Sequence, residues 1–309
     1  MSSQNKVIIL LGPTGVGKTE TSILLAQSLT TEIISADSMQ IYRHMDIGTA
    51  KPTKQEMSLV KHHMIDIVEP SESFSTGQYI EQVIPVIEGL HHQGKIPVIV
   101  GGTGLYIKAM TRGLFSGPSA DWHLREELLD REKEKKGSLY ASLMKLDPSA
   151  AARIMENDTR RIVRALEVCL KAGTGITQLQ ESLTSPLPYD FLRIGLTRER
   201  KELYGLIEKR VDSMLAAGLV DEVRNVLLRN PGKTALQAIG YKEIAAYLRE
   251  EYPLEEGVQL IKKRSKNYAK RQTTWFKREA GIRWVNATGQ FNAEKIYKAI
   301  AIFIQNELP

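Results

Sequence analysis

The fold of this chain is decided near its beginning, in the stretch VIILLGPTGVGKTE at residues 7–20. An apolar run at residues 7–11 comes before Gly12-Pro13-Thr14-Gly15-Val16-Gly17-Lys18-Thr19, and a helix-compatible segment continues over residues 20–29. This block matches the pattern G-x-x-x-x-G-K-[ST], and its position between a strand and a helix is typical of a phosphate-binding loop. The stretch therefore predicts an α/β fold that opens with a phosphate loop.

The chemistry of the loop explains its composition. Glycines let successive backbone N–H groups turn toward an anion, and the helix that follows adds partial positive charge. Lys18 is expected to neutralise phosphate oxygens, and the Thr19 hydroxyl is expected to bind Mg²⁺ as the cofactor. The pattern selects a diphosphate or triphosphate and leaves the rest of the ligand open. Nucleotide hydrolysis is not indicated, because the strand expected at residues 97–100 ends in Gly101-Gly102-Thr103-Gly104, without a carboxylate.

Further short apolar runs predict the rest of a sheet. Strands are expected at residues 7–11, 32–36, 64–68, 97–100, 192–196 and 283–286. Several of these runs are continuously apolar, which is typical of strands buried on both faces, and helix-like segments alternate with them. The pattern predicts a P-loop NTPase-like α/β core with a doubly wound parallel sheet.

The interval between the fourth and fifth expected strands is too long for a simple crossover. About 90 residues separate Val100 from Leu192, whereas a crossover needs far fewer. Helices are indicated at residues 121–136, after Asp147-Pro148, and at residues 159–171. We therefore expect residues 116–199 to form a helical insertion domain within a core made of residues 1–115 and 200–309.

Composition excludes several classes of protein. The 309 residues are 42% hydrophobic and 25% charged, the ordinary mix of a globular protein and not of a disordered chain. Cys169 is the only cysteine, so neither an intrachain disulfide nor a cysteine-based zinc site can form. No secretory leader is apparent, and the longest apolar runs fall far short of the ~18 residues of a membrane span. A cytoplasmic protein without a membrane partner is expected.

The net charge of +6 is concentrated in one place. Residues 262–283 contain nine basic side chains and one acidic, a local charge of +8, so the remaining residues carry −2. Within the helix expected at residues 255–278, one stripe combines cations with aromatic rings: Arg264, Tyr268, Arg271, Trp275 and Arg278. Such a stripe suits a nucleic acid, although a solvated helix face with a buried Trp275 is the alternative. A second basic group, Arg160, Arg161 and Arg164, lies in the insertion.

Asp37 follows the second expected strand. Because ligands of doubly wound sheets bind at the carboxyl ends of the strands, Asp37 is expected to face the phosphate loop. Its position alone allows three roles: an outer ligand of magnesium, a general base, or the N-cap of the next turn. The polar loop at residues 46–52 has no periodicity and is expected to contact substrate.

These blocks together resemble the tRNA dimethylallyltransferases. The phosphate loop is followed, in the family's order, by residues 35–42, 46–52, 101–106, 157–167, 237–243 and 269–275. The resemblance implies that the loop holds the diphosphate of dimethylallyl diphosphate. The acceptor is then the N6 amine of the adenosine 3′ of the tRNA anticodon, at position 37. The sequence ends at Pro309 without the zinc-finger extension of eukaryotic relatives, so it resembles the bacterial form.

The resemblance also implies roles for individual residues. It makes Asp37, Lys18 and Arg210 catalytic, with Asp37 accepting the proton of the amine. The residues that it implies in tRNA binding are Asp37, Ser38, Met39, Gln40, Thr103, Arg125, Arg160, Arg161, Arg164, Gln237, Gly240, Tyr241, Lys242, Lys270, Arg271, Gln272 and Trp275. The insertion would contact the anticodon stem-loop, and we expect a monomer. The alternatives are a P-loop small-molecule kinase and an RNA-binding NTPase switch without catalysis.

Overall fold

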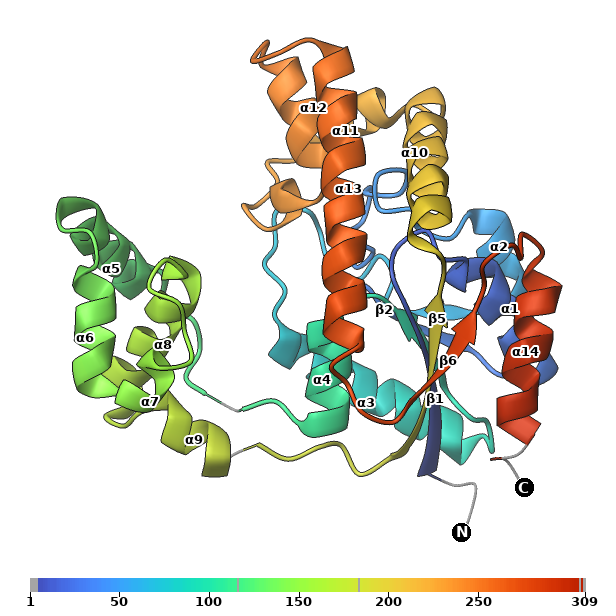
Figure 1. Cartoon of the computed structure of the whole chain (residues 1–309), viewed down its shortest axis with the longest axis horizontal. Helices are drawn as coiled ribbons and strands as arrows, with labels where there is room; N and C mark the ends of the chain where they lie inside the picture. The colour runs from blue at the N-terminus through green and yellow to red at the C-terminus, as the bar shows by residue number, and fades with distance from the viewer. Residues whose placement is uncertain (1–4, 116, 183, 306, 308–309) are drawn as a thin grey trace. The chain divides into compact units, whose positions relative to one another are not determined.

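The chain divides into two compact units. A computed structural model describes residues 5–115, 117–182, 184–305 and 307 (Figure 1). The first unit combines Met1–Ile107 with Pro188–Pro309, and the second is Lys108–Leu187. The second unit therefore begins before and ends before the expected insertion at 116–199. The C-terminal limit differs because the strand Asp190–Thr197 pairs within the sheet of the first unit.

A six-stranded parallel sheet forms the centre of the first unit. Its spatial order is β3-β2-β4-β1-β5-β6. The strands are β1 (Lys6–Leu11), β2 (Ile33–Ala36), β3 (His62–His63), β4 (Val98–Gly101), β5 (Asp190–Thr197) and β6 (Ile282–Asn286). Every residue from Val7 to Leu11 is 0% exposed, which requires packing on both faces of the sheet. The predicted doubly wound parallel sheet is confirmed.

The prediction of a strand at residues 64–68 is wrong. The sheet instead pairs His62 with Ile33 and His63 with Ile34. Met64 and Asp66 have φ angles of 61° and 56°, which extended strands do not adopt. Only Val68 keeps an isolated bridge, to Tyr42. Residues 64–68 therefore fold as a partly buried loop beside the sheet edge, with Met64 and Val68 buried.

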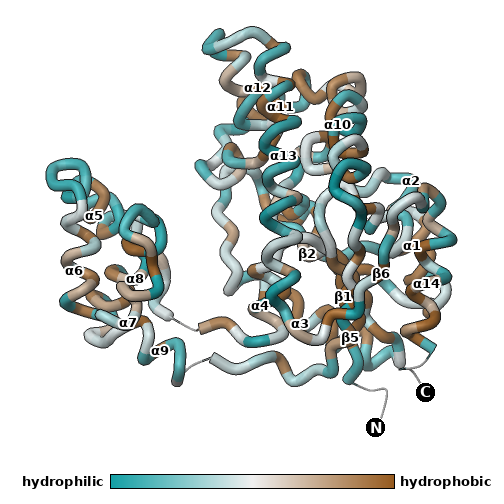
Figure 2. The backbone as a smooth tube through the Cα atoms, in the orientation of Figure 1, coloured by the Kyte–Doolittle hydropathy of each residue, from teal (hydrophilic) through white to brown (hydrophobic). Residues whose placement is uncertain are grey.

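Helices surround the sheet and build the rest of the first unit (Figure 1). They are α1 (Lys18–Ser28), α2 (Lys54–Leu59), α3 (Thr76–His92), α4 (Gly104–Arg112), α10 (Arg200–Ala216), α11 (Leu219–Leu227), the short 3₁₀ helix Ala235–Gln237, α12 (Tyr241–Leu248), α13 (Leu254–Phe276) and α14 (Ala293–Gln305). α4 continues across the limit between the two units. The main core joins β1, β4, β5 and β6 to apolar residues of α1, α10, α13 and α14. Figure 2 shows brown segments near β1, whereas α13 carries long hydrophilic stretches.

The second unit is helical, as its sequence predicts. It contains α5 (Trp122–Glu134), α6 (Ser138–Leu146), α7 (Pro148–Ala151), α8 (Thr159–Ala172) and α9 (Ile176–Ser182). Asp121, Asp147 and Asp158 cap α5, α7 and α8 by accepting backbone N–H groups. Buried residues of α5, α6 and α8 form its own core. The second unit is therefore a helical unit with a hydrophobic core of its own, as is typical of a domain.

The register of the strands brings their carboxyl ends to one level. Ala36 pairs with Gly101, Gly101 with Leu11, and Leu11 with Gly195. The loops that leave β1, β2, β4 and β5 therefore start side by side. Gly101 allows this close approach, because a Cβ at that position would lie 2.1 Å from the Ala36 carbonyl oxygen.

No helix in the described part of the chain is both long and apolar enough to cross a bilayer.

Candidate active site

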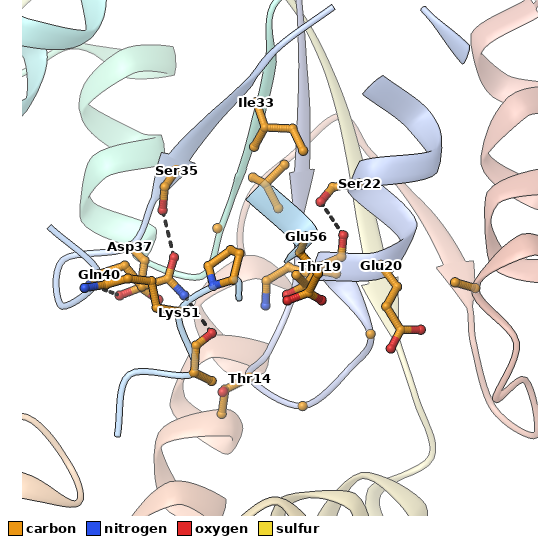
Figure 3. A pocket seen from close by; sticks show the side chains of 18 of the residues that line it. Thr14, Thr19, Glu20, Ser22, Ile33, Ser35, Asp37, Gln40, Lys51 and Glu56 are labelled. Atoms are coloured by element: carbon orange, nitrogen blue, oxygen red, sulfur yellow. Dashed lines mark hydrogen bonds between the residues drawn. The ribbon is translucent and has the colours of Figure 1, made fainter. Parts of the chain in front are cut away.

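The phosphate loop lies between β1 and α1, as predicted. Gly17 has a φ of 106° and serves as the N-cap of α1, so Lys18 begins the helix. The Lys18 ammonium donates hydrogen bonds to the carbonyl oxygens of Gly12 and Pro13, at 2.9 and 3.0 Å. Residues of the loop, including Thr14 and Thr19, line a cavity of about 450 Å³ (Figure 3).

Two cations and one carboxylate lie within electrostatic reach of each other at this cavity. Burial lowers the pKa of Lys18 to about 8; Asp37 opposes this shift and Arg210 adds to it. Burial also lowers the pKa of Arg210, and Asp37 again opposes the shift. Arg210, from α10, donates to the Thr14 hydroxyl and lines the same cavity. The structure therefore brings together all three residues that the resemblance implies as catalytic.

Asp37 divides its carboxylate between two tasks. Its Oδ1 accepts the backbone N–H groups of Met39 at 2.9 Å and of Gln40 at 3.4 Å, which caps the turn after β2. Within the described residues, no hydrogen bond is made to the other oxygen, Oδ2. The side chain lines the cavity beside Gln40 (Figure 3). The N-cap role is thus observed, and one oxygen remains for substrate.

The exits of β2 and β4 are joined by Thr103. The Ser38 backbone N–H donates to the Thr103 hydroxyl at 3.0 Å. Gln40 extends the same surface: it accepts a hydrogen bond from the Ser35 hydroxyl at 3.1 Å and donates to the Ala50 carbonyl at 3.1 Å. Met39 packs against an apolar cluster instead of the cavity. The block 37–40 therefore supplies Asp37 and Gln40 to the site.

The polar loop at residues 46–52 forms one wall of the cavity. Thr49, Ala50, Lys51 and Pro52 line it. The Lys51 ammonium is buried, where it donates to the Tyr42 carbonyl at 2.9 Å and pairs with Asp46 and Asp66. These contacts fix the loop beside Asp37.

The inner face of α13 holds the site together. Gln272 is 6% exposed; it accepts the Thr14 N–H at 2.8 Å and donates to the Gly102 carbonyl at 2.9 Å. Burial, with Asp37 nearby, raises the pKa of the Tyr268 hydroxyl, and the side chains of Thr103 and Gln272 oppose this shift. Gln272, implied in tRNA binding, thus ties the phosphate loop to the exit of β4.

The outer face of α13 is less uniformly cationic than the periodicity predicts. Arg264 pairs with the buried carboxylate of Glu243, and Lys262 and Lys266 pair with acidic residues of α10 at 2.6 and 2.5 Å. Lys270 and Arg271 are exposed. No acidic partner of either is found in the described residues.

Trp275 is 36% exposed and lies against the exit of β4. A Cβ at Gly104 would come within 2.6 Å of its indole. The stripe therefore has an exposed part and a packing part, and its role in nucleic-acid binding stays a prediction.

The basic residues of the second unit differ among themselves. Arg125 and Arg164 both bind Glu167, whose side chain is 0% exposed. Burial alone would raise the pKa of Glu167, but hydrogen bonds from Arg125, the Asp121 N–H and Arg164 hold it below its usual value. Arg160 and Arg161 are exposed at the start of α8. Arg161 also pairs with Asp158 at 3.3 Å, so the exposed cationic surface of this unit lies at the start of α8, where Arg160 has no ion-pair partner among the described residues.

The block near residue 240 is also mixed. Gln237 and Lys242 are exposed. Gly240 has a φ of 99°, and its N–H donates to Glu243 at 2.7 Å. Tyr241 is fully buried, and its hydroxyl donates to Glu222.

Sequence reasoning missed Arg198, which lines the cavity, and Glu222, which binds the polar loop beside it. Arg198 lines the cavity and donates to the Val16 and Gln290 carbonyls at 3.3 and 2.9 Å. It directly follows β5, so the rule that pointed to Asp37 would have found it as well. Glu222 lies on α11, with no local pattern to mark it.

One protein oxygen at the cavity, the Thr19 hydroxyl, is suited to bind a magnesium ion. The Thr19 hydroxyl faces the cavity, and within the described residues it makes no other hydrogen bond. Among the described residues, no group of three or more acidic, His or Cys side chains is placed so that it could hold a metal ion. This donor set fits a Mg²⁺ ion that is held mainly by substrate phosphates and water.

Comparison with known proteins identifies relatives over nearly the full length. The sequence profile described as IPP transferase matches residues 40–279. A tRNA dimethylallyltransferase of Thermodesulfovibrio yellowstonii is 56% identical over 309 residues, with 96% of this chain and 98% of the relative covered. The tRNA dimethylallyltransferase of Halothermothrix orenii is 46% identical, with 95% and 91% covered.

Solved structures resemble this chain equally broadly. The full-length tRNA isopentenylpyrophosphate transferase of Bacillus halodurans is 43% identical with a TM-score of 0.73, and 98% and 96% of the two chains are covered. A eukaryotic dimethylallyltransferase acting on tRNA is 31% identical with a TM-score of 0.80, and 98% and 80% are covered.

Proposed function

Because the chain belongs to the tRNA dimethylallyltransferase family, we propose that it transfers the dimethylallyl group of dimethylallyl diphosphate to the N6 amine of the adenosine 3′ of the anticodon. It is a transferase that modifies tRNA, like its relatives, and not a small-molecule kinase. The observation that supports the proposed chemistry is the single cavity that Lys18, Arg210 and Asp37 share.

The phosphate loop is the proposed site of the donor's diphosphate. Residues 12–19 offer backbone N–H groups, and the two partly buried cations, Lys18 and Arg210, line the same cavity as the loop. A leaving diphosphate gains negative charge as the C–O bond breaks, so fixed cations stabilise the transition state more than the bound donor. When bound, Mg²⁺ would be held by Thr19 and would further neutralise the diphosphate.

Asp37 is the proposed acceptor of the proton. The amine nitrogen forms a bond to the allylic C1 while the bond from C1 to the diphosphate oxygen breaks, and the diphosphate leaves with the electron pair. One amine proton passes to the free Oδ2 of Asp37. Since the adenine lone pair is delocalised into the ring, a positioned carboxylate helps by orienting the amine as well as by accepting its proton.

The acceptor adenosine must leave its stack to reach this cavity, as in other enzymes that modify a base. Lys270 and Arg271 on α13 are the proposed phosphate contacts in the first unit, with Arg160 and Arg161 in the second. We further propose that the protein acts as a cytoplasmic monomer.

A labelling experiment tests the activity. Purified protein is incubated with tRNA from a strain that lacks the modification, either with labelled dimethylallyl diphosphate or with γ-labelled ATP. We expect label from the prenyl donor on tRNA, in a nucleoside that mass spectrometry identifies as N6-dimethylallyladenosine. Label from ATP on a small metabolite, with none from the prenyl donor on tRNA, would contradict the proposal.

A further inference from the structure

Three consecutive backbone N–H groups of the polar loop converge on one carboxylate. Glu222 Oε2 accepts the N–H groups of Asp46 and Ile47, at 3.0 and 2.7 Å, and Oε1 accepts that of Gly48 at 3.0 Å. Successive N–H groups that point inward form an anion-binding nest. In this protein, the anion in the nest is a side chain of α11, which lies 174 to 176 positions further along the chain.

Tyr241 donates a further hydrogen bond to the same carboxylate. Its hydroxyl donates to Glu222 Oε1, so the carboxylate accepts four hydrogen bonds. Its ring packs so closely on Gly48 that a Cβ there would lie 2.4 Å from a ring carbon. The loop is therefore clamped between the Glu222 carboxylate and a fully buried ring.

The clamp lies next to the wall of the cavity. Thr49, Ala50, Lys51 and Pro52 follow the clamped residues directly and line the cavity. Gln40 holds the far side of this wall by donating to the Ala50 carbonyl at 3.1 Å, close to Asp37 (Figure 3). If the diphosphate binds at the phosphate loop and the amine at Asp37, the allyl group must lie between them, against this wall.

We propose that Glu222 is a positioning residue for the prenyl donor: it fills the nest of residues 46–48 and thereby places residues 49–52 against the allyl group. The proposal rests on the proposed function. In this proposal Glu222 contacts neither substrate. Removal of the Glu222 side chain should therefore affect use of the prenyl donor more than binding of tRNA.

The first test is Glu222→Ala with chemical rescue. The variant leaves three N–H donors and a space where formate can bind. We expect the KM for dimethylallyl diphosphate to rise about tenfold to 100-fold, since displacements of about 1 Å at a reacting centre have effects of this size. The Kd for tRNA should stay within about twofold, because Glu222 bonds to none of the exposed cations that are the proposed phosphate contacts. Added sodium formate should lower the KM again, and sodium chloride should not.

Asp221→Ala is the matched control. Asp221 is the adjacent residue of α11, exposed and paired only with Arg224 among the described residues. Its replacement should leave the KM unchanged and insensitive to formate.

Glu222→Gln covers the case in which the alanine variant does not fold. Its carbonyl oxygen can still accept the Asp46 and Ile47 N–H groups, but its amide N–H₂ would oppose the Gly48 N–H. It should raise the KM without formate rescue, because no space is created.

The results separate the two proposals. Wild-type protein that does not prenylate tRNA would contradict the proposed function. An active wild-type protein with an unchanged donor KM in both Glu222 variants would overturn the positioning role. Equal loss of donor use and tRNA affinity, with no response to formate, would also overturn it and would make Glu222 a general structural residue.

Discussion

At the scale of single residues, Asp37 shows how one carboxylate can serve the fold and the reaction. Oδ1 caps the turn after β2, and Oδ2 is the oxygen left to face substrate. Replacement by asparagine keeps an oxygen for the cap and removes the base. Asp37→Asn is therefore a cleaner test than Asp37→Ala, which removes the cap as well.

We expect Asp37→Asn to lower kcat for prenyl transfer about 100-fold to 10,000-fold, the usual contribution of general base catalysis. The Kd for tRNA should change by no more than a few-fold. Single-turnover kinetics and a filter-binding titration measure the two quantities. A kcat close to that of the wild type would exclude Asp37 as the base.

The Lys18 ammonium predicts a pH dependence of donor binding. Its pKa is about 8 in the free protein, and a bound diphosphate stabilises the charged form and so raises that pKa. Below pH 8 the group is already protonated and binding needs no proton. Above pH 8 binding must take one up, so affinity for diphosphate should fall about tenfold per pH unit.

Calorimetric titration with diphosphate at pH 7, 8 and 9 measures this effect. Lys18→Arg is the control, since a guanidinium stays charged over the whole range. The ratio of the two affinities cancels the ionisation of diphosphate itself. A constant ratio from pH 7 to 9 would contradict the depressed pKa.

The residues of the site differ in how far the sequence alone reveals them. Lys18 and Thr19 belong to a contiguous pattern, and Asp37 follows from its place after a strand. Arg210 has no such mark, because its partner Thr14 is 196 positions away, and only the family resemblance singled it out. Glu222 was missed for the same reason. Contacts between distant segments depend on packing that no local pattern encodes.

At the scale of elements, α13 is a helix with two different faces. Its inner face places Tyr268 and Gln272 at the site, whereas its outer face exposes Lys270 and Arg271. Periodicity correctly predicted the helix and the shared stripe. It could not predict that Arg264 would pair with Glu243, because the pairing partner lies on α12.

The outer face of α13 should carry part of the salt dependence of tRNA binding. Replacing Lys270 and Arg271 together by alanine should weaken tRNA binding and reduce the slope of log K against log salt by about one unit per lost phosphate contact. Binding titrations from 50 to about 300 mM salt measure the slope. Lys262→Ala is the control: its ammonium already pairs with Asp212, so its slope should stay near that of the wild type. An unchanged slope in the double variant would make this face a solvated surface.

The accuracy with which strands were predicted depends on their length. The long buried strands β1 and β5 were located to within two residues, whereas the two-residue β3 was misplaced. So short a strand is defined by its neighbour β2 and hardly by its own composition. The residues that follow β3 lie in a loop. An apolar run in the sequence does not distinguish such a loop from a strand.

At the scale of the whole molecule, the two units have separate cores and should lose structure separately. Glu167 is a fully buried acid of the second unit, and its removal leaves Arg125 and Arg164 without their carboxylate. Breaking a fully buried pair costs about 3–5 kcal/mol, and the cost here should be lower, because the Arg125 and Arg164 side chains are 23% and 34% exposed. Glu167→Ala should therefore destabilise the second unit selectively.

Hydrogen exchange by mass spectrometry measures this selectivity. Peptides from Lys108–Leu187 should exchange faster in Glu167→Ala, while those of the sheet and the affinity for diphosphate should stay unchanged. Asp130→Ala, which removes an exposed acid of α5 paired with Lys133, is the control and should exchange like the wild type. Faster exchange throughout the chain would mean that the units unfold together.

The common level of the strand ends determines which changes in chain length the molecule tolerates. Deleting one residue inside β2 would draw Asp37 back by about 3.3 Å and turn the remaining side chains to the opposite face of the sheet. The same deletion in β1 would displace the phosphate loop from the exits of β2, β4 and β5, with which it is now aligned. Insertions and deletions in this molecule should therefore be confined to the connections far from that edge. Exchanges among Val, Ile and Leu within the strands should be tolerated, because they leave the chain length unchanged.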